Sequence, residues 1–154
     1  MPRTAAQPET TDRQTSVDHA PLTADDVAEQ TDAGSFKRGK GYQRSGHIFG
    51  AVRREHTLRA RCHGSSGGPY LVEATLASTG SKIKTNPMSY FCNCPRGGFC
   101  KHVVALLLTW IEDPESFEVR PPIADLLTGK SSQELVALIE LMVREVPELE
   151  ELLE

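Results

Sequence analysis

The pattern of apolar positions divides the chain into three parts, of which the first has almost no apolar residues. Up to about residue 34, Thr, Asp, Gln, Pro and Ala dominate. Such a segment buries too little surface to offset the entropy lost on ordering, so we predict that residues 1–34 form a largely disordered acidic tail. Its one candidate element is a short helix within 21–30, with Thr23 as N-cap and Asp25 and Asp26 in the first turn.

From His47 onward, apolar and polar residues alternate with a period of two. The alternation runs through residues 48–53, where Ile48, Gly50 and Val52 share one face, and again through 58–63 and 70–76. This period predicts half-buried strands. The breaks "RREH" and "GSSGGP" are typical of hairpin connections, and a longer loop leads to a fourth strand, "MSYFCNC" (88–94). We therefore expect a small antiparallel sheet of three or four strands.

The remaining elements are predicted to be helical. An apolar run from His102 to Ile111 indicates one helix, which should end before Pro114. Residues 123–130 and 131–146 suggest two more, and Ser131 and Glu134 have the spacing of a capping box. The last of these helices has one apolar face, formed by Leu135, Leu138, Ile139 and Met142. A final turn over 147–154 ends with its apolar face unfinished, which is typical of a chain that continues beyond this point.

The charge of the chain is strongly segregated, although the net charge is only −4. Residues 36–110 carry twelve basic and two acidic side chains, a net +10, whereas residues 1–35 carry −5 and residues 111–154 carry −9. A basic module of this kind is the electrostatic footprint of nucleic-acid binding. Alternatives remain: an ordinary solvated face, neutralisation by the acidic ends, or an acidic protein partner.

The basic side chains that could contact nucleic acid are spread over the strands, the long loop and the cysteine-rich segment. The candidates are Arg53, Arg54, Arg59, Arg61, Lys82, Lys84, Arg96 and Lys101. Few aromatic residues could stack on bases (Phe49, Tyr70, Tyr90, Phe91 and Phe99), and we expect most of these five to belong to the core. Binding should therefore involve mainly phosphates and depend strongly on salt.

Three of the four cysteines and one histidine fall within eleven residues, in the order Cys92-x-Cys94, five residues, Cys100-x-His102. A Cys₃His set closes a tetrahedral structural zinc site. Cys92 and Cys94 share one side of an extended strand, "PRGGF" supplies turn residues, and Cys100 precedes a helix whose first turn holds His102. Cys62 shares register with Leu58 and Ala60, so we expect a buried free thiol there. A Cys100–His102 nucleophile pair lacks an orienting group, and we expect no enzymatic activity.

This signature, together with "YLVEATL" and the apolar "CKHVVALLL", resembles the SWIM-type zinc finger. The upstream "SFKRGKGY…GHIFGAV" resembles the flank of bacterial members. The resemblance spans about residues 35–112. It implies that Cys92, Cys94, Cys100 and His102 bind one structural Zn²⁺ in a ββα-like unit. It also implies a role in DNA binding or in protein interaction.

Together these features predict an α+β protein in three parts: a disordered acidic tail (1–34), a basic zinc-finger module (35–112) and an acidic helical segment (113–154). The sheet should lead into the ββα-like finger, and the C-terminal helices follow it. The expected function is nucleic-acid (DNA) binding, and the alternative is a protein-interaction adaptor that uses the C-terminal helices. The chain has no secretory signal and no apolar run of the ~20 residues that span a bilayer, so we expect no membrane partner and a reducing, cytoplasmic location.

Overall fold

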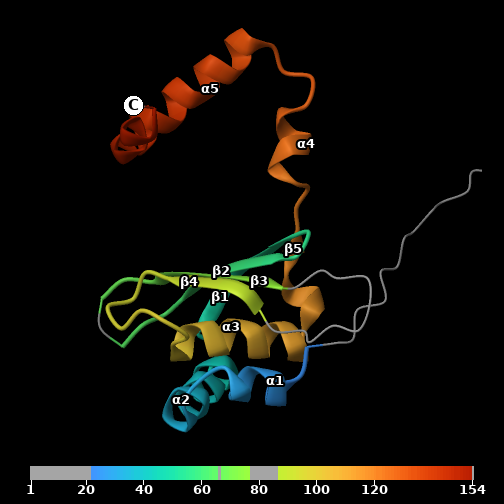
Figure 1. Cartoon of the computed structure of the whole chain (residues 1–154), viewed down its shortest axis with the longest axis vertical. Coiled ribbons are helices and arrows are strands. Elements are labelled where there is room, and N and C mark those ends of the chain that lie inside the picture. Colours follow the sequence, from blue (N-terminus) through green and yellow to red (C-terminus); the bar gives the residue numbers. More distant parts are fainter. Residues whose placement is uncertain (1–21, 66, 77–86, 154) are drawn as a thin grey trace, which may run out of the picture.

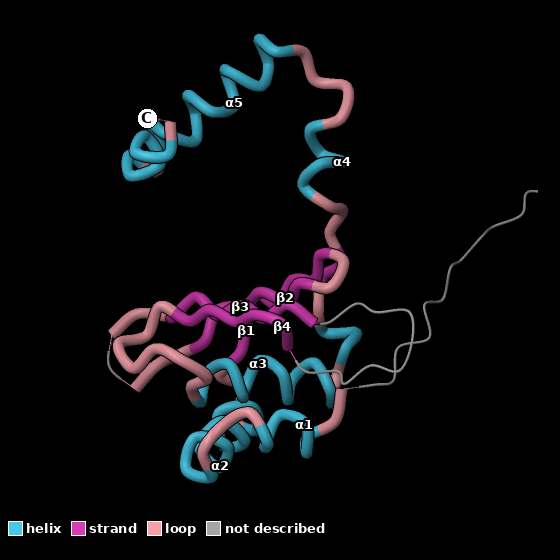
Figure 2. Tube along the Cα trace, viewed as in Figure 1, coloured by secondary structure: helices cyan, strands magenta, loops and turns pink. Residues whose placement is uncertain are grey.

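The computed structural model describes residues 22–65, 67–76 and 87–153. The predicted tail is described only from Leu22 onward, and Lys82 and Lys84 lie outside the described residues. The helices are α1 (Ala24–Glu29), α2 (Ala33–Arg44), α3 (Lys101–Glu112), α4 (Ile123–Leu127) and α5 (Ser132–Glu145), with the 3₁₀ turns η1 (Pro114–Ser116) and η2 (Pro147–Leu152). The strands are β1 (Ile48–Arg54), β2 (Thr57–Cys62), β3 (Tyr70–Leu76), β4 (Pro87–Cys92) and β5 (Glu118–Val119). This confirms the predicted α+β class (Figure 2).

The main body has three layers, with α3 in the middle (Figure 1). The sheet covers one side of α3, and α1 and α2 cover the other. Val103, Val104, Leu106 and Leu107 are completely buried, as expected of a helix that is apolar all round. Leu22 and Val27 join the same core, so the N-terminal segment belongs to this body from Leu22 onward.

The short helix α1 confirms the one element predicted in the N-terminal segment. The Thr23 side chain accepts a hydrogen bond from the Asp26 backbone, and the Asp26 carboxylate accepts one from the Thr23 backbone. Val27 of α1 is fully buried against the core. This reciprocal capping satisfies two of the free N–H groups at the start of the helix.

The helix α2 was not predicted from the sequence. Asp32 caps it by accepting a hydrogen bond from the Ser35 backbone N–H at 2.8 Å. Its glycines have low helix propensity, so the sequence does not indicate a helix here. Gly39 nevertheless allows α2 to pack closely against α3. A Cβ at Gly39 would lie 2.4 Å from Val104 Cγ1 and 2.8 Å from the Lys101 carbonyl oxygen.

Replacing Gly39 with alanine should therefore separate α2 from α3 and lower the free energy of unfolding by about 1–3 kcal/mol, because the new methyl group overpacks the contact. Gly41→Ala is the matched control on the same helix, since a Cβ at Gly41 meets nothing within 4 Å. That change should stabilise by about 0.5–1 kcal/mol through helix propensity. Urea denaturation of the zinc-loaded variants measures both; equal effects would contradict the close α2–α3 packing.

The predicted antiparallel sheet is confirmed: β1 pairs with β2, β2 with β3, and β3 with β4. The structure adds β5, which pairs in parallel with β1. The strand order is β4-β3-β2-β1-β5. The predicted face for Val52 is wrong. A bulge between Phe49 and Val52, where Gly50 has φ +58°, turns Val52 to the side of Arg59 and Arg53 to the side of Leu58.

The C-terminal helices project from the end of the sheet and form an arm (residues 120–153) that stands off the main body (Figure 1). The predicted capping box of Ser131 and Glu134 is present at the start of α5. No residue of α4, α5 or η2 is buried, so the apolar face predicted for α5 has no cover in the described structure. In the described part of the chain, every helix is too short or too polar to cross a membrane.

Candidate metal centre

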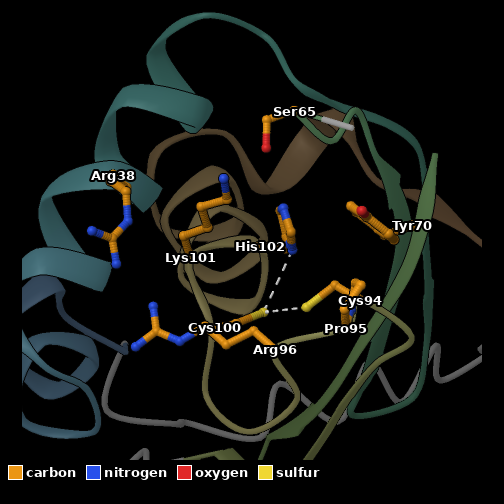
Figure 3. A pocket seen from close by; sticks show the side chains of 9 residues that line it. All are labelled: Arg38, Ser65, Tyr70, Cys94, Pro95, Arg96, Cys100, Lys101 and His102. Atoms are coloured by element: carbon orange, nitrogen blue, oxygen red, sulfur yellow. Dashed lines mark hydrogen bonds between the residues drawn. The ribbon is translucent and has the colours of Figure 1, made fainter. Parts of the chain in front are cut away.

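Three consecutive elements bring the four predicted ligands together. Cys92 ends β4, and Cys94 follows it just before the turn. Gly97 and Gly98, with φ of +64° and +63°, reverse the chain in a left-handed conformation that favours glycine. Cys100 is then the N-cap residue of α3. His102 lies in the first turn of α3, where its ring faces back towards the sulfurs (Figure 3).

The distances between the ligand atoms match those of a zinc tetrahedron. Around Zn²⁺ bound at ~2.3 Å from sulfur and ~2.0–2.1 Å from nitrogen, two sulfurs lie about 3.8 Å apart and a sulfur and a nitrogen about 3.6 Å apart. Here Cys94 Sγ and Cys100 Sγ are 3.7 Å apart. His102 Nδ1 lies 3.6 Å from both Cys92 Sγ and Cys100 Sγ. All four ligand atoms fall within 4.8 Å of one another.

The cluster is shielded from water, because Cys94, Cys100 and His102 are at most 7% exposed. A hydrogen bond from Cys92 lowers the pKa of the Cys100 thiol, with help from His102 and from backbone N–H groups at the helix start. The same interaction with Cys100 raises the pKa of Cys92. Thiolates at such a position are the species that bind a metal, and four protein donors leave no open coordination position. The residues therefore fit one structural Zn²⁺, which would fix the end of β4 to the start of α3.

Cys62 takes no part in this cluster. Its side chain is fully buried in the core, and the thiol is free, as predicted. Burial raises the pKa of this thiol to about 12, so it remains protonated at neutral pH. It is a core residue and not a fifth ligand.

The segment between α1 and α2 holds the turn of the metal centre in place. The Thr31 hydroxyl donates a hydrogen bond to the Phe99 carbonyl oxygen at 2.9 Å. The Arg96 guanidinium donates to the Ser35 hydroxyl at 2.6 Å and to the Asp32 carboxylate at 2.9 Å. Hydrogen bonds from Ser35, followed by the charge and hydrogen bond of Arg96, lower the pKa of Asp32 to about 2. Residues upstream of the cysteines thus support the turn directly.

The basic side chains predicted to contact nucleic acid do not share one surface. Arg53 lies over the Trp110 ring of α3, and Arg54 donates a hydrogen bond to the Pro121 carbonyl oxygen. Arg59 pairs with Glu73 across the sheet, and Arg61 is exposed nearby. Arg96 and Lys101 lie beside the metal centre (Figure 3). The bulge in β1 separates Arg53 from Arg59 and Arg61, and the ion pair occupies Arg59. Neither feature is visible in the strand alternation.

Sequence reasoning also missed the contribution of α2 and misplaced two aromatic residues. Arg38 of α2 lies beside Arg96 and Lys101, and its signal was the helical spacing of basic residues in "KRGKGYQR" (37–44). Phe91 and Tyr90 are 51% and 45% exposed, so the expectation that most of the five candidate aromatics belong to the core fails for these two. β4 is an edge strand, which leaves both rings without a covering neighbour on one side.

Comparison with known families gives a match to part of this chain. Residues 71–111 match the SWIM zinc finger family, over β3, β4, the turn and α3. Curated proteins and solved structures give no match to this chain. The matched segment contains all four side chains of the cluster, in the geometry described above. The chain therefore carries a SWIM zinc finger over residues 71–111, in which Cys92, Cys94, Cys100 and His102 are positioned to hold one structural Zn²⁺.

Proposed function

We propose that this zinc-finger module binds nucleic acid, with DNA as the expected partner, through its basic surfaces. The observation that carries the proposal is the side of the sheet opposite α3, here called the open face. No helix of the three-layer body covers it, and α5 stands off from it (Figure 1). Arg61, Phe49 and Leu71 form one row across it, and Arg59, Glu73 and Phe91 form another.

The open face combines the two features that bind a nucleic-acid strand. The exposed Phe91 ring offers a surface on which a base can stack. Arg61 offers a positive charge for phosphates and has no acidic partner within the described residues. Contacts of this kind give little sequence readout, so affinity should depend mainly on phosphates and salt. Zinc would act indirectly, by holding β4 and α3 in place.

This role is binding and not catalysis. Four protein donors would close the coordination shell of the metal, so no position would remain for a water or a substrate. A reducing cytoplasmic compartment would suit the site, because it keeps the thiols available to zinc.

A second candidate function is that of a protein-interaction adaptor, and α5 is the observation that favours it. Val136, Ile139, Leu141 and Met142 are all exposed on this helix. The C-terminal segment that contains them is acidic, with a net −9 over residues 111–154. Exposed apolar side chains on an acidic helix would fit a basic, apolar groove on a partner. In that case the zinc finger would serve as a scaffold for the arm.

Charge reversal at Arg61 tests the first function against the second. Arg61→Glu should weaken binding of fluorescein-labelled single- and double-stranded DNA about tenfold at low salt, because an attractive charge on the binding face becomes repulsive. Arg144→Glu is the matched control, since Arg144 is an exposed arginine of α5 on the arm. Fluorescence anisotropy should show at most about a twofold change for the control. Equal losses in the two variants would contradict binding on the open face.

A further inference from the structure

We propose that the hollow beside the metal centre is a phosphate-binding site, in which Arg38, Arg96 and Lys101 hold a backbone phosphate of the nucleic acid. The proposal deepens the function proposed above and rests on it for the source of the phosphate. The hollow has a volume of about 370 Å³ and lies between α2, the turn after β4 and the start of α3. Its remaining lining residues are Ser65, Tyr70, Cys94, Pro95, Cys100 and His102.

The charges around the hollow favour an anion. Three of the nine residues that line it are cationic and none is acidic. Asp32 is bound to Arg96 and has a pKa of about 2, so this carboxylate offsets one of the three cations. A Cys₃His site with Zn²⁺ would carry a further single negative charge. One positive charge therefore remains, and no acidic partner for Arg38 occurs among the described residues.

The two guanidinium groups are also held in position. Arg38 Nη2 and Arg96 Nη1 both donate to the hydroxyl of Ser35, at 3.3 Å and 2.6 Å. Ser35 is completely buried, so this shared acceptor fixes the two groups close together. Figure 3 shows them on the same side of the hollow, facing each other. Two like charges kept at this separation repel one another, and an oxyanion that accepts hydrogen bonds from both would relieve that repulsion.

His102 supplies the second, independent observation. Its Nδ1 faces the sulfurs, so its other ring nitrogen, Nε2, carries the proton when the ring binds a metal. Nε2 is buried and has no hydrogen-bond partner in the part of the chain that the structure describes. Figure 3 shows this nitrogen pointing away from the sulfurs, between Lys101 and Tyr70. A phosphate oxygen in the hollow would accept a hydrogen bond from Nε2 once the half-buried side chains of Lys101 and Tyr70 shift slightly.

Lys101 completes the site from the start of α3. Its ammonium group donates to the Tyr42 hydroxyl at 2.6 Å and lies 4.4 Å from the centre of the Tyr42 ring. An ammonium group has three donors, so two remain for a ligand. The first turn of α3 adds the partial positive charge of a helix N-terminus. The hollow is therefore surrounded by donors from two helices and one turn.

Removing the charge of Arg38 tests the site without touching a zinc ligand. Arg38→Gln in the zinc-loaded full chain should raise the Kd for labelled DNA about tenfold at low salt and reduce the slope of log K against log salt by about one, the loss of one phosphate contact. Lys37→Gln is the matched control, because Lys37 is an exposed cation of the same helix that does not line the hollow. It should change the Kd by no more than about twofold.

The outcomes separate the two proposals. If wild type binds DNA and the two variants weaken it equally, the phosphate site is wrong and the proposed function stands. If wild type binds no DNA, the proposed function fails, and pyrophosphate added to ¹⁵N-labelled protein then decides the site. A shift of the His102 side-chain ¹⁵N signals in wild type but not in Arg38→Gln would support a site for free phosphate. Unchanged signals in wild type would overturn it.

Discussion

Cys94→Ala is expected to abolish zinc binding and to unfold residues 45–110. Zinc binding in comparable small fingers contributes roughly 10–16 kcal/mol, whereas a whole domain is stable by only about 5–15 kcal/mol. In this chain the zinc ligands join β4 to α3, and α3 is the centre of the core. Losing the metal should therefore remove both the turn and the packing that depends on it. Thermal melting followed by circular dichroism, with metal analysis on the same sample, measures the effect.

Cys62→Ala is the matched control for this change. Cys62 is as deeply buried as Cys100 but lies outside the cluster. This variant should keep one zinc per chain and lose only about 1 kcal/mol of stability, the cost of a small cavity. A strong chelator added to wild type should reproduce the effect of Cys94→Ala. An unchanged melt after verified zinc removal would show that zinc does not support the fold.

Leu106→Ala is expected to have the second-largest effect on stability. Leu106 is completely buried in α3, the helix that lies between the sheet and the helices α1 and α2. Shortening a leucine in such a site costs about 2–5 kcal/mol, from lost burial and from the cavity that remains. Urea denaturation of the zinc-loaded protein should show the loss as a lower midpoint with an unchanged slope.

Leu141→Ala on α5 removes the same atoms from an exposed position. Leu141 is 48% exposed, so the free energy of unfolding of the variant should stay within about 0.5 kcal/mol of the wild-type value. A comparable loss in both leucine variants would mean that the arm packs on the body in solution. A small loss in Leu106→Ala alone would contradict the central place of α3 in the core.

The metal centre could be predicted from the sequence because its signal is local. Cys92, Cys94, Cys100 and His102 lie within one short segment, and their spacing sets the strand, the turn and the helix start that bring them together. The alternation of β2 and β3 and the capping residues Thr23 and Ser131 are equally local. In each case the residues that decide the structure are neighbours in the chain.

Features that depend on distant contacts could not be predicted in this way. The glycines of α2 lower its helix propensity, and the compensating contact of Gly39 with Val104 joins residues far apart in the sequence. After the bulge at Gly50, the residues of β1 point to the opposite faces from those that the alternation predicts. As a result Arg53 lies over Trp110, and Val52 lies beside Arg59. Charge counts also could not show which arginines have partners.

The structure therefore narrows the set of basic residues that can contact nucleic acid. Of the predicted contacts, Arg59 is offset by Glu73, while Arg96 and Lys101 join Arg38 at the hollow beside the metal centre. Arg61 remains on the open face with the exposed Phe91. These two regions are where we place phosphates and bases, and the variants at Arg38 and Arg61 test them separately.

The most direct test of the account is to titrate labelled single- and double-stranded DNA with zinc-loaded protein between about 50 and about 300 mM salt, with the zinc content determined on the same sample. We expect one zinc per chain and an affinity that falls linearly in log K against log salt, with a slope of several units. One zinc per chain with no binding of either DNA at about 50 mM salt would contradict nucleic-acid binding by this module.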